Sequence, residues 1–154
     1  MSTTIVSLVD NFKEAIDAVT GNMLMEAAKA GGNVIEGHAK VNASSGRPGL
    51  EIQTGNLVNS INVSEEKSAK QFAEVAVGPS NVIYAAIHEF GGIIVPLHAP
   101  MLSWVDRDTG ERIFAKAVHI PARPYLRPAI DNNKDEIVGA VETELWRNLD
   151  RATR

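Results

Sequence analysis

Apolar residues recur at steps of three and four positions near the start of the chain, a spacing that predicts an amphipathic helix from Ser7 to about Val41. The apolar positions are Leu8, Phe12, Ala15/Ile16, Val19, Met23, Ala27, Val34 and Ala39/Val41. Gly21, the pair Gly31–Gly32 and Gly37 weaken this helix, because glycine costs about 1 kcal/mol relative to alanine in a helix interior. We therefore expect a break or kink near Thr20–Gly21, followed by a longer helix whose glycines permit close packing.

After a loop rich in Ser, Gly and Pro, short apolar alternations predict two β-hairpins. The four strands are Leu57–Val63, Phe72–Val77, Leu102–Val105 and Arg112–Val118. The polar run Glu65–Ser68 is expected to form the first hairpin turn, and Asp108–Gly110 the second. Thr54–Gly55 suits a sharp turn that leads the loop into the first strand.

Two further segments are predicted to be helical. A short helix at Val82–Phe90 is expected to end at Gly91–Gly92, since glycine favours the position just after a helix, and Ser80 is expected to cap its start. The final helix is expected to begin at Pro128, because the missing proline N–H costs nothing in the first turn of a helix. Acidic residues near its start and arginines near its end match the helix dipole.

This order of elements predicts an α+β fold in one domain spanning residues 1–154. A long N-terminal helix, in one piece or two, and a C-terminal helix are expected to pack on a small antiparallel sheet, with a short helix connecting its hairpins. Flexible loops are expected at about 42–53 and 92–112. Trp104 and Trp146 occupy apolar positions of a strand and a helix, so packing in the core is expected for both.

Composition narrows the classes of function. A net charge of −4 over 154 residues argues against a chain that binds nucleic acid through general electrostatics. The absence of cysteine removes disulfides and thiolate metal sites. No apolar run approaches the roughly 20 residues that span a bilayer, so no membrane partner is expected, and the N-terminus carries no signal peptide pattern, so we expect synthesis in the cytosol.

Motifs for catalysis and for metal binding are incomplete. His88–Glu89 begins like a metalloprotease helix, but Gly92 stands where the second histidine ligand is needed. The chain contains neither a phosphate-binding loop nor a nucleophile elbow. We therefore predict no catalytic residue, no cofactor and no metal. Two alternatives stay open: a metal-dependent enzyme that uses histidine and carboxylate side chains, and a nucleic-acid-binding module.

The segment Ile120–Ala129 is the most specific feature of the chain. Its three prolines fix three φ angles and push the preceding residues toward extended geometry, so the segment is stiff. Between the prolines lie a tyrosine, a leucine and two arginines, side chains that are suited to anchoring one surface against another. This combination favours a role in docking over one in catalysis.

Three blocks occur in order along the chain: Thr54–Ile61 (TGNLVNSI), Tyr84–Gly92 (YAAIHEFGG) and Ile120–Ala129 (IPARPYLRPA). With the Ala-rich helix before them, they resemble the tail-completion and head–tail joining family of long-tailed double-stranded DNA phages. The resemblance covers most of residues 20–150. Two departures stand out: Val58 occupies a position where that family often carries Arg or Lys, and the stretch between the second and third blocks is longer than in short members.

The resemblance implies a structural protein of the virion, made in the host cytoplasm, that forms a ring of six copies at the head-proximal end of the tail tube. Its expected partners are further copies of itself, the tail tube and the neck or connector proteins, with genomic DNA passing through the ring without specific binding. We expect Glu89 to be paired with Arg123 or Arg127, because an acid in an apolar helix end needs a partner. The interface candidates are Thr54, Gly55, Leu57, Glu89, Trp104, Arg123, Pro124, Tyr125, Leu126 and Arg127.

Overall fold

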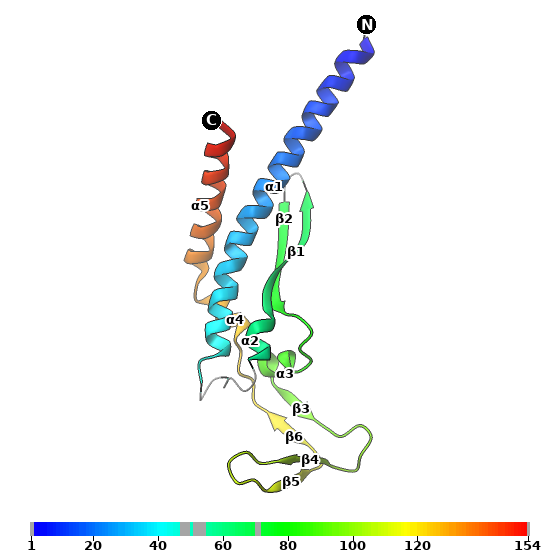
Figure 1. Cartoon of the computed structure of the whole chain (residues 1–154), viewed down its shortest axis with the longest axis vertical. Helices are drawn as coiled ribbons and strands as arrows, with labels where there is room; N and C mark the ends of the chain where they lie inside the picture. Colours follow the sequence, from blue (N-terminus) through cyan, green and yellow to red (C-terminus); the bar gives the residue numbers. More distant parts are fainter. Residues whose placement is uncertain (1, 47–49, 51–54, 70–71, 154) are drawn as a thin grey trace.

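The computed structural model describes residues 2–46, 50, 55–69 and 72–153 (Figure 1). Its helices are α1 (Ser2–Ala43), α2 (Asn56–Ser60), α3 (Ala85–Phe90), α4 (Leu126–Asp131) and α5 (Lys134–Thr153). Its strands are β1 (Ile61–Ala69), β2 (Phe72–Pro79), β3 (Gly92–Ile94), β4 (Leu102–Val105), β5 (Arg112–Ala115) and β6 (Val118–Ile120). The predicted α+β class, with long helices at both ends of the chain and a short helix between hairpins, is confirmed.

Helix α1 is the element on which the rest of the body packs. Helix α5 lies along one side of it and the β1–β2 hairpin along the other, and α4 contacts its C-terminal part (Figure 1). The predicted break near Thr20–Gly21 is wrong, since α1 continues through both residues and Gly21 is buried. Tertiary packing of a long amphipathic helix outweighs the roughly 1 kcal/mol that one glycine costs.

The adjacent glycines of α1 explain how two neighbours approach it at the same level. A Cβ on Gly31 would lie 2.8 Å from Cγ2 of Val141 on α5. A Cβ on Gly32 would lie 3.0 Å from Cγ1 of Val63 on β1. The expectation that glycines permit close packing of this helix is confirmed, and each glycine serves a different neighbour.

The first hairpin differs from the predicted one at both ends. Leu57 lies in α2 and not in a strand: Gly55 adopts the left-handed φ of 74° and accepts a hydrogen bond from the Asn59 N–H, which starts a helical turn. The run Glu65–Ser68 belongs to β1, where the pairing with β2 shifts register between Glu65 and Lys67. Leu57 of α2 packs against the core cluster that contains Ile61 of β1, so the pattern of apolar residues did not distinguish this helical turn from a strand.

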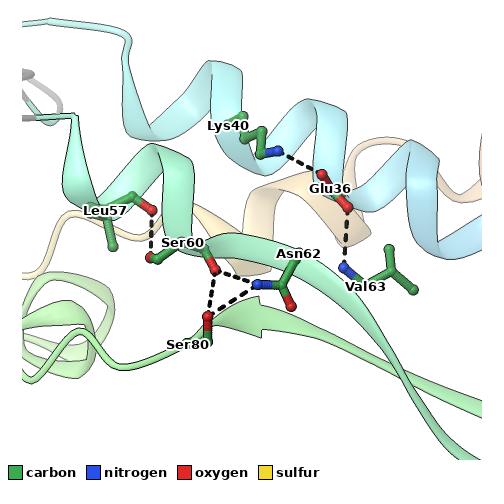
Figure 2. A network of polar contacts seen from close by, with 7 residues as sticks. All are labelled: Glu36, Lys40, Leu57, Ser60, Asn62, Val63 and Ser80. Carbon is green, nitrogen blue, oxygen red and sulfur yellow. Dashed lines mark hydrogen bonds and ion pairs between the residues drawn. The ribbon is translucent and has the colours of Figure 1, made fainter.

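Side chains from three segments fix the start of β1 (Figure 2). Glu36 on α1 accepts hydrogen bonds from Lys40 Nζ at 2.6 Å and from the backbone N–H of Val63 at 3.1 Å. Ser60 donates its hydroxyl to the Leu57 carbonyl at 2.7 Å. Ser80 donates to the Ser60 carbonyl at 3.4 Å and does not cap α3, whose N-cap residue is Tyr84, so that expectation is wrong.

Residues 92–120 form an extension that we call the arm, which projects from the body at the end opposite the N-terminus (Figure 1). Strand β3 pairs with β6 near the body, and β4 pairs with β5 further out. The predicted strand Arg112–Val118 is therefore two strands, because Val118 pairs with Ile94 and not with β4. The interval 92–112, expected as a flexible loop, contains β3 and β4.

The C-terminal helix is divided into α4 and α5 around Asn132 and Asn133, where a single helix from Pro128 was expected. Asn133 donates its side-chain amide to the Ala129 carbonyl at 2.9 Å, a local bond with which asparagine competes against helix continuation. The apolar pattern continues across the break, so the pattern did not reveal it. Asp135 and Glu136 in the first turn of α5 and Arg151 in its last turn confirm the expected charge distribution.

The two tryptophans are on the surface. Trp104 on β4 is 39% exposed and Trp146 on α5 is 70% exposed, so the expected core packing is wrong for both. The core cluster instead consists of three alanines of α1 and α4 together with Leu50, Ile61 and Tyr125. Across the described residues, we find no helix whose length and apolar content suffice to cross a membrane.

We predict that Gly31→Ala lowers the free energy of unfolding by about 1–2 kcal/mol, because the added methyl overpacks against the stiff Val141 side chain by more than alanine gains in helix propensity. Gly37→Ala is the matched control, since a Cβ there meets nothing within 4 Å, and it should raise stability by up to about 1 kcal/mol. Urea unfolding of the three proteins checks the opposite signs. Equal stabilisation by both substitutions would contradict close packing at Gly31.

Candidate functional site

Glu89 at the end of α3 holds the proline-rich segment, which we define as residues 120–129. The Glu89 side chain is only 8% exposed. Its Oε2 accepts hydrogen bonds from the backbone N–H groups of Tyr125 at 2.7 Å and Leu126 at 3.0 Å, and its Oε1 accepts one from the N–H of Arg127 at 3.0 Å. One buried carboxylate therefore binds three consecutive backbone donors.

These donors are the N–H groups that the first turn of α4 cannot satisfy by itself. A helix leaves four such groups unpaired at its start, here those of its N-cap residue Tyr125 and of the next three positions. Glu89 accepts from the first three, and the fourth position is Pro128, which has no N–H. The start of α4 is thus fully satisfied by one side chain from another helix.

The expected pairing of Glu89 with an arginine side chain is wrong. The prediction that this acid is buried and bound is confirmed, but its partners are backbone groups, including the N–H of Arg127 and not its guanidinium. Within the described part of the chain, neither Arg123 nor Arg127 takes part in a salt bridge. A pattern of charged residues shows side chains and not backbone N–H groups. The sequence therefore indicated that Glu89 needs a partner, but not which groups bind it.

A second contact ties the segment to the end of α3. The N–H of Arg123 donates to the His88 carbonyl at 2.7 Å. Gly91 follows α3 with φ of 70°, and a Cβ there would lie 2.8 Å from the Ala122 nitrogen. Only glycine combines this left-handed conformation with so close an approach of two backbones, which explains why Gly91 ends the helix.

Tyr125 anchors the proline-rich segment in the hydrophobic core of the monomer. It is 1% exposed and packs in the cluster that includes Ala39, Ala43, Ile61 and Ala129. The side-chain amide of Asn42 donates to its carbonyl at 3.0 Å. The expectation that Tyr125 contacts a partner is therefore corrected, since its ring is enclosed within the monomer. Burial, with a smaller contribution from the nearby negative charge of Glu89, raises the pKa of Tyr125 to about 12.

The other interface candidates lie in different environments. Leu57 and Leu126 are partly buried and pack against the core, while Gly55 begins α2. Arg123, Pro124 and Arg127 are exposed on the outer side of the segment and stay available to a partner. Trp104 lies out on the arm, away from the rest, and Thr54 lies outside the described residues.

An open pocket of about 300 Å³ lies beside the proline-rich segment. It is lined by Asn42, Ser45, Leu50, Ala122, Arg123, Pro124 and Pro128. The sequence pattern did not predict that Asn42 and Ser45 lie beside Ala122–Pro128, about eighty positions further along the chain.

The histidine next to Glu89 lies at the same junction. His88 stacks edge to face on Tyr84, with ring centroids 5.7 Å apart. Burial is the larger cause that lowers the pKa of His88, and the positive charge of Arg123 is the smaller one. The imidazole ring is therefore mainly neutral at pH 7. Among the described residues there is no group of three or more side chains that could hold a metal ion.

We predict that Glu89→Ala lowers the free energy of unfolding by about 3 kcal/mol or more, because buried N–H groups of Tyr125, Leu126 and Arg127 lose a charged acceptor. Glu89→Gln should lose less, since its amide oxygen still accepts hydrogen bonds. Glu142→Ala, an exposed position on α5, serves as the control and should change stability by less than about 0.5 kcal/mol. Chemical denaturation measures all three, and equal effects of Glu89→Ala and Glu142→Ala would contradict the role of this carboxylate.

Alkaline pH is expected to destabilise the fold through Tyr125. Its folded-state pKa of about 12 lies above the usual value near 10, so the stabilisation is complete below about pH 10 and is lost as pH rises toward 12. The loss should reach roughly 2 kcal/mol and should be absent from Tyr125→Phe, which keeps the buried ring. Unfolding measured from pH 8 to 12 tests this, with Tyr84→Phe as a control that retains the loss. Parallel pH profiles for wild type and Tyr125→Phe would contradict it.

Comparison with known proteins identifies the family. The sequence profile of the phage virion morphogenesis family matches residues 36–146. No curated protein and no solved structure matches the chain. The matched region runs from the last turns of α1 into α5 and contains Glu89, the arm and the proline-rich segment. Since it spans more than half of the sequence, the chain belongs to the phage virion morphogenesis family, and its role lies in assembly of the phage virion.

Proposed function

We propose that the chain is a structural, non-enzymatic protein that forms a ring at the head-proximal end of the phage tail and takes part in joining tail to head. The observation that carries this proposal is the arm, which projects from the body (Figure 1). Several large apolar side chains of the arm are exposed. A surface of this kind needs a protein partner. Membership of a virion morphogenesis family supplies the setting in which that partner is found.

The arm carries several large apolar side chains that are exposed. These residues are each between 39% and 86% exposed: Ile93, Ile94, Val95, Leu97, Met101, Trp104, Val105 and Phe114. Exposed apolar side chains that lie together commonly mark sites of protein–protein interaction.

The outer hairpin also lacks support within the monomer. Among the described residues, β4 and β5 pair only with each other, and an isolated two-stranded hairpin is at best marginally stable in water. Apolar side chains occupy both of its faces, with Trp104 opposite Ile113 on one face and Val105 and Phe114 on the other. At least one face is therefore expected to be covered after assembly.

A ring requires a second, different surface on each subunit, because closed cyclic symmetry joins subunits head to tail. The outer side of α4 and α5 offers one, through the exposed side chains of Ile130, Val138, Trp146 and Leu149. We propose six copies in the ring, with the tail tube and the neck or connector proteins as neighbours. The net charge of −4 is compatible with a ring that lets genomic DNA pass without holding it.

The double substitution Val105→Ser/Phe114→Ser tests the arm. Both side chains are exposed, so the protein should fold with a stability within about 0.5 kcal/mol of wild type. Phage carrying it should lose infectious particles by several orders of magnitude and accumulate unjoined heads and tails, because the interface is missing. Phe72→Ser, at an exposed position of the β1–β2 hairpin away from the arm, is the matched control and should keep normal titres.

Circular dichroism and thermal melting establish that each variant is folded, and plaque titres with electron microscopy of lysates measure assembly. Normal titres from a folded Val105→Ser/Phe114→Ser protein would remove the arm from the assembly interface.

A further inference from the structure

We propose that the tip of the β4–β5 hairpin, residues Asp106–Glu111, of one subunit docks into the pocket beside the proline-rich segment of a second copy, with its carboxylates facing Arg123. This inference rests on the proposed ring and names the contact that would close it. It assigns a function to two features that the core of the monomer leaves unused, namely the pocket and the charged hairpin tip.

The receiving site combines an open pocket with an exposed cation. Leu50, Ala122 and the rings of Pro124 and Pro128 form its apolar lining, and Asn42 and Ser45 add polar groups at its edge. The Arg123 side chain lines the same pocket and is exposed. Among the salt bridges of the described residues, none involves Arg123, so its charge is free to meet an acidic group from outside.

The hairpin tip presents acids on a rigid turn. Asp106 accepts hydrogen bonds from the N–H of Asp108 at 3.0 Å and from the N–H and hydroxyl of Thr109 at 2.9 and 3.1 Å. These hydrogen bonds, of which the one from the Thr109 N–H has the largest effect, lower the pKa of Asp106 and keep its carboxylate ionised. Asp108 and Glu111 remain exposed, so the tip carries three carboxylates against the single guanidinium of Arg107.

The geometry of the chain favours a second copy as the occupant. Residues Ala122 and Arg123 follow β6 directly, so the pocket lies at the root of the arm, whereas residues 106–111 form its outer turn. A contact between tip and root therefore joins two different surfaces, as a head-to-tail ring requires, and does not pair identical surfaces across a two-fold axis. Opposite charges at the two surfaces set the register of the subunits and disfavour contact between two tips.

Disulfide trapping in assembled phage tests this contact, because the wild-type chain has no cysteine. The pair Arg107→Cys and Ala122→Cys places one thiol at the tip and one in the pocket wall while Arg123 and the tip acids stay in place. A disulfide needs the two Cα atoms to come within about 7 Å. Mild oxidation of purified particles should therefore give a ladder of linked subunits that ends at the ring size. The control pair, Arg107→Cys with the exposed β2 position Ala76→Cys, should stay monomeric on the gel.

A charge exchange gives a second, independent measurement. Arg123→Glu should lower the titre by on the order of 100-fold, and adding Asp108→Arg should restore at least a tenth of the wild-type titre, because the pair is re-formed with reversed signs.

Three results would overturn the inference while leaving the proposed ring intact: joined particles that carry the ring but give no ladder, an equal ladder from the control pair, or linkage of the tip to a tail-tube or connector protein. If the particles contain no ring of this protein at all, the proposed function itself is wrong.

Discussion

The contact on which the rest of the structure depends is that between the Glu89 carboxylate and three backbone N–H groups at the start of α4. Helix α3 leads directly through Gly91 into β3, and β6 leads directly into the proline-rich segment. The chain therefore leaves the body and returns to it at one junction, which Glu89 and the bond from Arg123 to His88 hold closed. Because Tyr125 packs with Ala39 and Ala43 of α1, it links that junction to the core.

This arrangement separates buried from exposed side chains at the junction. The side chains that point inward at the junction, Glu89 and Tyr125, are buried in the monomer. The side chains of the proline-rich segment that point outward are exposed, namely those of Arg123, Pro124 and Arg127. Several large apolar side chains of the arm are exposed as well. The stiff segment thus fixes the direction of a projecting, apolar element relative to a stable body. A rigidly placed arm costs less conformational entropy on binding than a free loop.

Residue patterns predicted the fold class, the long terminal helices and the close packing at Gly31–Gly32, because these depend on local periodicity and on residue size. The burial of Glu89 was also predictable, since an acid among apolar positions needs partners. What the pattern could not show was governed by contacts distant in sequence. The backbone groups that bind Glu89, the buried position of Tyr125 and the exposure of Trp104 depend on which segments meet in space. Apolar residues in a projecting hairpin have the same spacing as residues of a core strand, so the exposed Trp104 was expected in the core.

The most direct test of a ring at the junction of head and tail is a cryo-electron microscopy reconstruction of that junction in the intact virion. We expect a closed ring of copies of this chain at the head-proximal end of the tail tube, with each arm lying against the neighbouring subunit and the Glu89 junction unchanged within each one. A reconstruction in which no density fits this chain, or in which single copies lie apart with their arms exposed to solvent, would contradict the proposal.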